Sequence, residues 1–191
     1  MVDPGAARSS GLSIALILAL LFCVLPAGAA TEDPDTAVDR IKAAFLYKFA
    51  SYVEWPATAF RQPDSPLVIG VAGADDIAEE LERVVAGRNV GGRSVRVLRV
   101  AGAGNAGNCC HILFIGARNE RAHVQELLGD TRGHPVLTVT DADAEHPNGS
   151  IINFLAVSHR VRFDISRQAA ERNGLQLRSQ LLAVAHQVSM Q

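Results

Sequence analysis

Apolar positions along the first part of the chain follow the spacing of a helix with one buried face. The stripe begins after a polar stretch, and its members stand three or four residues apart: Val38, Ile41, Phe45, Phe49, Tyr52 and Val53. Thr36 and Asp39 have the spacing of a capping box, which predicts that the helix starts at Thr36. Trp55-Pro56 is expected to end it, because proline disfavours helical geometry in the residue before it.

Short apolar runs bounded by turn residues predict the strands. They cover residues 67–72, 93–100, 111–115, 136–140, 150–156 and 160–165. In the last run, apolar residues alternate with Arg160, Arg162 and Asp164, as expected of an antiparallel edge hairpin with one face in water. Helices are predicted between the earlier strands, one capped by Asp75 or Asp76 and stopped by Gly87, another capped by Asn119 and continuing through Leu128.

The C-terminal part of the chain predicts two further helices. Ser166 caps the first, which closes at Asn173-Gly174, and an amphipathic helix covers residues 179–188. This order predicts a single α/β domain over residues 30–191. Its mixed, mostly parallel sheet has about six strands, flanking helices and the antiparallel edge hairpin.

Residues 1–29 have the three zones of a signal peptide. Arg8 precedes an uncharged apolar run over residues 12–25, which Pro26 stops before the roughly 20 residues that a spanning helix needs. Small residues follow, and cleavage after Ala29 fits them. We therefore expect export to the periplasm, with a retained N-terminal anchor as the alternative.

Charge and cysteine content narrow the choice of partners and chemistry. The 18 basic and 20 acidic residues form no single-sign field, which argues against a nucleic-acid partner. After cleavage only Cys109 and Cys110 remain. Adjacent side chains of an extended segment point to opposite faces, so no shared metal site is expected. Cys110 is then either a small buried residue or, with Cys109, a redox or intermolecular site.

Two further patterns resemble binding sites. Gly102, Gly104 and Gly107 spell a dinucleotide-binding fingerprint, but the helix that should follow is missing, so no cofactor is predicted. Asp141 and Asp143 follow a predicted strand at the carboxyl end of the sheet, where Asp75 also lies. They form either a solvated turn or a loop for a cation or polar ligand. No nucleophile, base and orienting group assemble, so neither catalytic nor metal residues are expected and the protein is predicted not to be an enzyme.

Several segments in order resemble the YfiR/HmsC-like family of periplasmic proteins over roughly residues 41–185. They are 42–49 (KAAFLYKF) with Trp55-Pro56, 110–115 (CHILFI), 135–139 (PVLTV), 149–154 (GSIINF), 162–165 (RFDI), Gly174-Leu175 and Ser179 with Leu181-Leu182. In disulfide-bearing members, the cysteine matching Cys110 pairs with one in the first strand. Gly70 stands there in this chain, so that bridge is not expected.

The resemblance implies a soluble periplasmic regulator that binds the periplasmic segment of an inner-membrane diguanylate cyclase. It would hold the enzyme inactive and so control cyclic-di-GMP and biofilm formation. The alternative is a small-ligand sensor acting on a histidine kinase or transporter. In either case a second copy of the chain, forming a homodimer, is a further candidate partner. Tyr52, Trp55, Arg162 and Asp164 are the candidate partner-binding residues. Trp55 is equally consistent with packing at a helix end, and Arg162 and Asp164 with a solvated strand edge.

Overall fold

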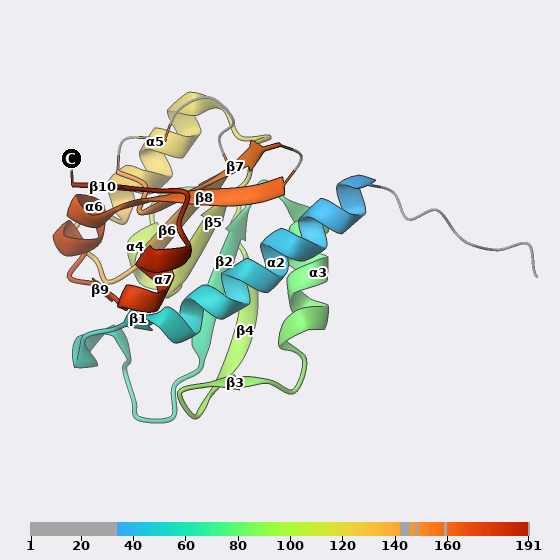
Figure 1. Cartoon of the computed structure of the whole chain (residues 1–191). Coiled ribbons are helices and arrows are strands. Elements are labelled where there is room, and N and C mark those ends of the chain that lie inside the picture. The colour runs from blue at the N-terminus through green and yellow to red at the C-terminus, as the bar shows by residue number, and fades with distance from the viewer. Residues whose placement is uncertain (1–33, 142–145, 148, 159, 191) are drawn as a thin grey trace, which may run out of the picture. The chain divides into compact units, whose positions relative to one another are not determined.

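The computed structural model describes residues 34–141, 146–147, 149–158 and 160–190, all within one compact unit (Figure 1). The expected signal peptide and Asp143 lie outside the described residues. Among the helices that are described, none combines the length and the apolar composition needed to cross a membrane. The expected α/β class is confirmed, with helices packed on a mixed and mostly parallel sheet.

The described residues form one eight-stranded sheet in the order β10-β8-β7-β6-β5-β2-β4-β3. Its parallel centre consists of β4 (Arg93–Arg99), β2 (Leu67–Ala72), β5 (Ile112–Ile115), β6 (Leu137–Asp141) and β7 (Ile152–Val157). β8 (Arg160–Ser166) is antiparallel to β7, β10 (Gln187–Ser189) is parallel to β8, and β3 (Asn89–Val90) is antiparallel to β4. Separately, β1 (Val53–Glu54) pairs with β9 (Gln176–Leu177).

Helices bury both faces of this sheet. One face carries α2 (Pro34–Tyr52), α3 (Asp75–Val85), α6 (Arg167–Arg172) and α7 (Ser179–Val184), and the other α4 (Ala106–Cys109) and α5 (Arg121–Asp130). A single 3-10 turn, η1 (Ala57–Ala59), follows β1. Strand β5 shows why both faces need cover: Ile112 and Phe114 join the first core, Leu113 and Ile115 the second.

Four phenylalanines attach α2 to the sheet. The ring of Phe49 lies 5.0 Å from Phe163 on β8 and 5.8 Å from Phe154 on β7, and Phe45 lies 5.6 Å from Phe163. Such edge-to-face and stacked contacts add about 0.5–1.5 kcal/mol per pair beyond burial of area. This packing fixes where α2 crosses the sheet.

The buried face of α2 differs from the predicted stripe. Ala43, Leu46 and Ala50 are buried together with Phe49, whereas Val38 and Ile41 are 37% and 46% exposed. The helix also starts at Pro34, so Thr36 lies inside its first turn and does not cap it. The stripe prediction was wrong for the first two turns, because periodicity does not tell where along the helix the sheet ends.

The predicted edges also need correction. The hairpin β7-β8 is antiparallel as expected, but β10 covers part of β8, so β8 is not the edge. The last helix stops at Val184, and the residues after it form β10. Asn119 does not cap α5, whose N-cap is Glu120. The prediction of about six strands missed the short β3 and β10, whereas Ser166 caps α6 as expected by accepting the Ala169 N–H.

Candidate functional site

Five charged side chains gather where the parallel strands end, and we call them the carboxyl-end cluster: Asp39, Lys42, Asp76, Arg118 and Asp141. Lys42 of α2 donates a 2.6 Å hydrogen bond to Asp141 Oδ2 at the end of β6, and the two side chains are only 15% and 11% exposed. Arg118 Nη2 lies 3.0 Å from Asp76 Oδ2. The cluster therefore attaches the first half of α2 to the sheet.

Asp39 lies one turn before Lys42 and interacts with all four other members. Burial raises the pKa of Asp39, Asp76 and Asp141 raise it further, and Lys42 and Arg118 oppose the rise. The cluster thus contains two cationic side chains and three carboxyl groups. A calcium-type site needs several carboxylate oxygens free for the metal, whereas here Asp76 and Asp141 already have cationic partners.

Two carboxylates of the predicted ligand loop, Asp75 and Asp141, have different partners. Asp75 Oδ1 lies 3.5 Å from Arg99 Nε, and Arg99 also binds Glu82 Oε1 at 2.5 Å, whereas Asp141 binds Lys42. Asp143 lies outside the described residues. No group of three histidine, cysteine or acidic residues among the described ones could hold a metal ion. A ligand at this loop stays a prediction.

Asn119 fills the space between the loops that follow β2 and β5. Its side-chain amide donates to Ala72 O at 3.0 Å and to Gly116 O at 2.9 Å. A Cβ atom on Gly73 would overlap Asn119, and the φ of +65° at Gly73 is one that other residues rarely adopt. Both the available space and the backbone conformation therefore require glycine at this position. The side chain that was expected to cap α5 instead ties together the loops where open α/β sheets bind ligands.

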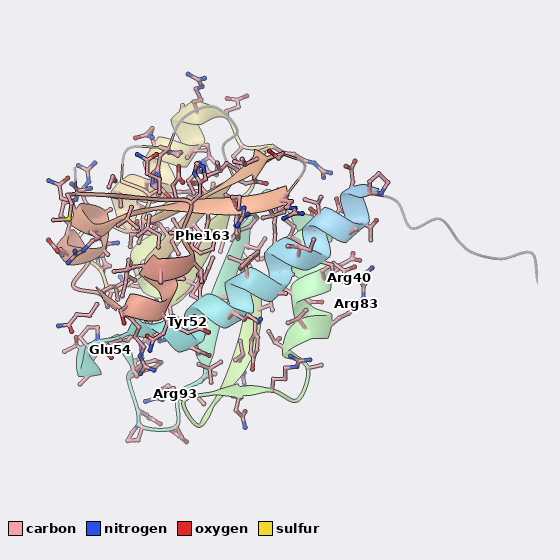
Figure 2. All side chains as sticks on the ribbon, in the orientation of Figure 1. Arg40, Tyr52, Glu54, Arg83, Arg93 and Phe163 are labelled. Atoms are coloured by element: carbon pink, nitrogen blue, oxygen red, sulfur yellow. The ribbon has the colours of Figure 1, made fainter. Side chains whose placement is uncertain are left out.

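A second group lies at the opposite, amino end of the strands, and we call it the aromatic column: Trp55, His111, Phe60 and Arg93. His111 stacks on Phe60 with ring centroids 4.4 Å apart, and Trp55 meets His111 edge-on at 6.4 Å. The Arg93 guanidinium carbon lies over the Phe60 ring, 3.7 Å from its centre. Figure 2 shows Arg93 beside the loop that leads from β1 to β2.

His111 is fixed by two backbone groups. The Val68 N–H donates to Nδ1 at 3.0 Å, so Nδ1 must be unprotonated, and Nε2–H then donates to Ala59 O at 3.1 Å. Burial lowers the pKa of His111, Arg93 lowers it further, and the bond to Ala59 opposes them. A neutral histidine therefore holds the loop of residues 55–66 against the sheet, and Arg93 helps by donating to Ser65 O at 2.8 Å.

Tyr52 is the last residue of α2 (Figure 2), Trp55 follows β1, and both side chains are half-buried. Both pack against the main core, and the Tyr52 carbonyl accepts a 3.0 Å hydrogen bond from the Arg178 N–H. Trp55 Nε1 is buried without a hydrogen-bond partner among the described residues. The position of Trp55 thus matches the helix-end packing role that the sequence also allowed.

Arg162 and Asp164 lie on the other face of β8. Phe163 and Ile165 point to the core under α2, and side chains alternate along a strand, so Arg162 and Asp164 point away from α2. Asp164 Oδ1 binds His186 Nδ1 at 2.9 Å, and Arg162 is exposed. The four predicted partner-binding residues are therefore not brought together on one surface.

Cys109 and Cys110 do not point to opposite faces. Cys109 ends α4 and Cys110 begins the extended segment, and this change of backbone brings their sulfurs to 2.8 Å. Both are free thiols, Cys109 half-buried and Cys110 buried. A Cβ atom on Gly70 would lie 2.8 Å from Cys110 Sγ, so Gly70 is the position facing this cysteine in the first strand, as the resemblance implied.

Sequence reasoning missed the aromatic column and Lys42. His111 was not among the predicted site residues, because Phe60 and Arg93 are far from it in sequence and share no motif with it. The one available signal was His111 at the start of a strand buried on both faces, where a polar ring needs fixed partners.

Comparison with known proteins agrees with the resemblance. The family model described as YfiR/HmsC-like matches residues 39–186. Among solved structures, a conserved domain protein from Vibrio cholerae O1 biovar El Tor is similar with a TM-score of 0.54 at 11% identity, and the match covers 79% of this chain. The chain spans 60% of that protein's length, and the likeness is one of fold. An ABC domain in complex with L-Trp from Streptococcus pneumoniae gives a TM-score of 0.48 at 12% identity, over 64% of this chain and 55% of that one.

Proposed function

The chain belongs to the YfiR/HmsC-like family of periplasmic regulatory proteins, and on that premise we propose that it binds the periplasmic segment of an inner-membrane diguanylate cyclase and holds the enzyme inactive. Cyclic-di-GMP output, and with it biofilm formation, then follows the state of this chain. The chain acts by binding, and no catalytic step is part of the proposal.

The extent of the family match is the observation that carries this proposal. Residues 39–186 take in every strand of the parallel centre and α2 from Asp39 onward. The carboxyl-end cluster and the aromatic column both lie inside that range. Both groups hold parts of the chain in place through internal contacts, which supports a role as a binding scaffold.

The exposed start of α2 is the docking surface that we propose. Val38 and Ile41 continue the same helical stripe as Phe45 and Phe49, but only the latter pair packs on the phenylalanines of the sheet. In Figure 1 this part of α2 extends beyond β8. Contiguous exposed apolar groups mark interaction sites, and Val38 and Ile41 are neighbours on the helix surface because they stand three residues apart.

This surface is also held rigid. Lys42 follows Ile41 directly, and its 2.6 Å bond to Asp141 fixes the backbone at that turn of the helix. A preformed surface loses little conformational entropy when a partner binds. Tyr52 at the far end of the helix extends the docking surface if the partner covers the whole of α2.

The test is binding of the purified chain to the tagged periplasmic segment of the membrane cyclase of the same cell. We expect Ile41→Asp to weaken binding at least tenfold, which corresponds to about 1.4 kcal/mol. Leu98→Asp is the matched control, because Leu98 on β4 is 41% exposed, close to the 46% of Ile41. Trp55→Ala is a poorer probe, since Trp55 packs against the core.

Cellular cyclic-di-GMP supplies the second readout. Deletion of the chain should raise it, the Ile41→Asp variant should raise it as deletion does, and Leu98→Asp should leave it at the wild-type level. Failure of the wild-type chain to bind any cyclase segment would refute the proposal. Capture of a sensor kinase in its place would keep the regulatory role and replace the partner.

A further inference from the structure

Cys109 and Cys110 form a pair of thiols whose geometry nothing in the proposed function uses. Their sulfurs lie 2.8 Å apart, and closing a bond of about 2.05 Å requires an approach of only about 0.8 Å. The space is available because Gly70 has no side chain, and Cys110 Sγ occupies the position next to it. Both thiols also lie near Ala106 O, at 3.5 and 4.0 Å.

The two thiols differ in reactivity. The hydrogen bond between the two thiols lowers the pKa of Cys109, although burial opposes the change. The same hydrogen bond, together with burial, raises the pKa of Cys110. Cys109 is therefore the more accessible thiol and the one that more readily becomes a thiolate, the form that attacks disulfides.

We propose that Cys109 and Cys110 are a redox site that closes reversibly to a disulfide between neighbouring residues when it meets a disulfide oxidant. The Cys109 thiolate attacks one sulfur of the oxidant, forms a mixed disulfide and releases one thiol. Cys110 then gives up its proton and attacks Cys109 Sγ, which releases the second thiol. Two protein thiols are oxidised, and one oxidant disulfide is reduced to two thiols.

The covalent geometry makes this bond labile. Neighbouring Cα atoms are about 3.8 Å apart, whereas disulfides usually join Cα atoms about 4.4–6.8 Å apart. Disulfides under such constraint are reduced more easily and belong to the regulatory class, while structural ones resist reduction. The site is therefore suited to reporting the thiol balance of its compartment. This inference is independent of the partner proposed above.

Mass spectrometry on the full chain tests the inference directly. The reduced protein is incubated with oxidised glutathione, quenched with N-ethylmaleimide and digested with trypsin without reductant. Residues 100–118 form one tryptic peptide that holds both cysteines, and the third cysteine of the sequence, Cys23, falls in a different peptide. We expect this peptide to be two hydrogens lighter and unlabelled, and to regain both labels after treatment with reduced glutathione.

Two variants distinguish the steps. Cys110→Ser should stop at a mixed disulfide with glutathione on Cys109. Cys109→Ser should react at roughly one tenth of the wild-type rate or more slowly still, because one pKa unit changes the thiolate fraction tenfold. Circular dichroism checks that both variants fold. A wild-type peptide that stays glutathionylated, links to a second copy or stays reduced would overturn the proposal, whatever the outcome of the cyclase experiment.

Discussion

His111 provides the sharpest test of how the fold holds its loop. Glutamine can replace the Nε2 edge of the ring and keep the donor to Ala59 O, but it leaves the Val68 N–H without its acceptor. A half-buried orphan donor costs about 1–3 kcal/mol, and the lost stacking on Phe60 about 0.5–1.5 kcal/mol. We expect His111→Gln to lower the free energy of unfolding by about 2–4 kcal/mol.

His111→Asn should have the opposite effect from His111→Gln on the hydrogen bonds to Val68 and Ala59. Its side chain can replace the Nδ1 edge and accept from Val68, while the bond to Ala59 and the stacking are lost. A net hydrogen bond contributes about 0.5–1.5 kcal/mol, so His111→Asn should cost about 1–3 kcal/mol in all. The glutamine variant should therefore be the less stable of the two.

The wild type should also lose stability in mild acid. The pKa of His111 is lowered in the folded state from its ordinary 6.5, so the unfolded chain binds the proton more readily. The contribution is then fully present above about pH 6.5 and is lost as pH falls through the lower, folded pKa. Protonation also removes the lone pair on Nδ1 that accepts from Val68.

Urea unfolding at about pH 8 and about pH 5 measures both effects. The loss between these pH values should be larger in the wild type than in His111→Gln, which has no group to titrate there. Asp39, whose pKa is raised, titrates in both proteins and cancels from the comparison. Equal stability of the asparagine and glutamine variants, or an unchanged pH dependence in the glutamine variant, would refute the assigned bonds.

Three further predictions follow from single contacts. Lys42→Met should lower the free energy of unfolding, measured in urea, by about 2–3 kcal/mol, less than the roughly 3–5 kcal/mol lost when a fully buried ion pair is broken. Adding Asp141→Asn should restore part of this loss. Additive effects of the two substitutions would contradict the pairing. Gly70→Cys should form a disulfide with Cys110, because the two Cβ atoms would be 3.3 Å apart, close to the usual range of about 3.5–4.5 Å. The bond should raise the free energy of unfolding by about 3–4 kcal/mol, and only when no reductant is present. Ser166→Ala should cost about 1 kcal/mol by removing the cap of α6, and retained stability would argue against the cap.

Much of the fold was predictable because its signals are local. The runs 67–72 and 112–115 are apolar throughout, and a strand buried on both faces needs no further information to be recognised. The β7-β8 hairpin follows from strict alternation, and the cap and stop of α6 from Ser166 and Gly174. Family membership was likewise predictable, since it depends on the order of such segments.

The candidate sites were much less predictable. Lys42 and Asp141 are 99 residues apart, and His111 meets Phe60 and Ala59 across about 50 residues. No periodicity encodes such pairs, because they depend on where α2 crosses the sheet and how the loop after β1 returns. The prediction that Cys109 and Cys110 point apart was wrong for a similar reason, as it assumed an extended chain where α4 ends.

The sequence by itself determined the alternation of strands and helices, the buried centre of the sheet and the family, because apolar spacing and turn residues act over a few positions. Only the tertiary structure decided which stretch of the α2 stripe is covered, which cation each carboxylate meets and that two neighbouring thiols touch. Those outcomes depend on distances between segments that are remote along the chain, and the packing of the four phenylalanines at the α2 crossing sets many of them at once.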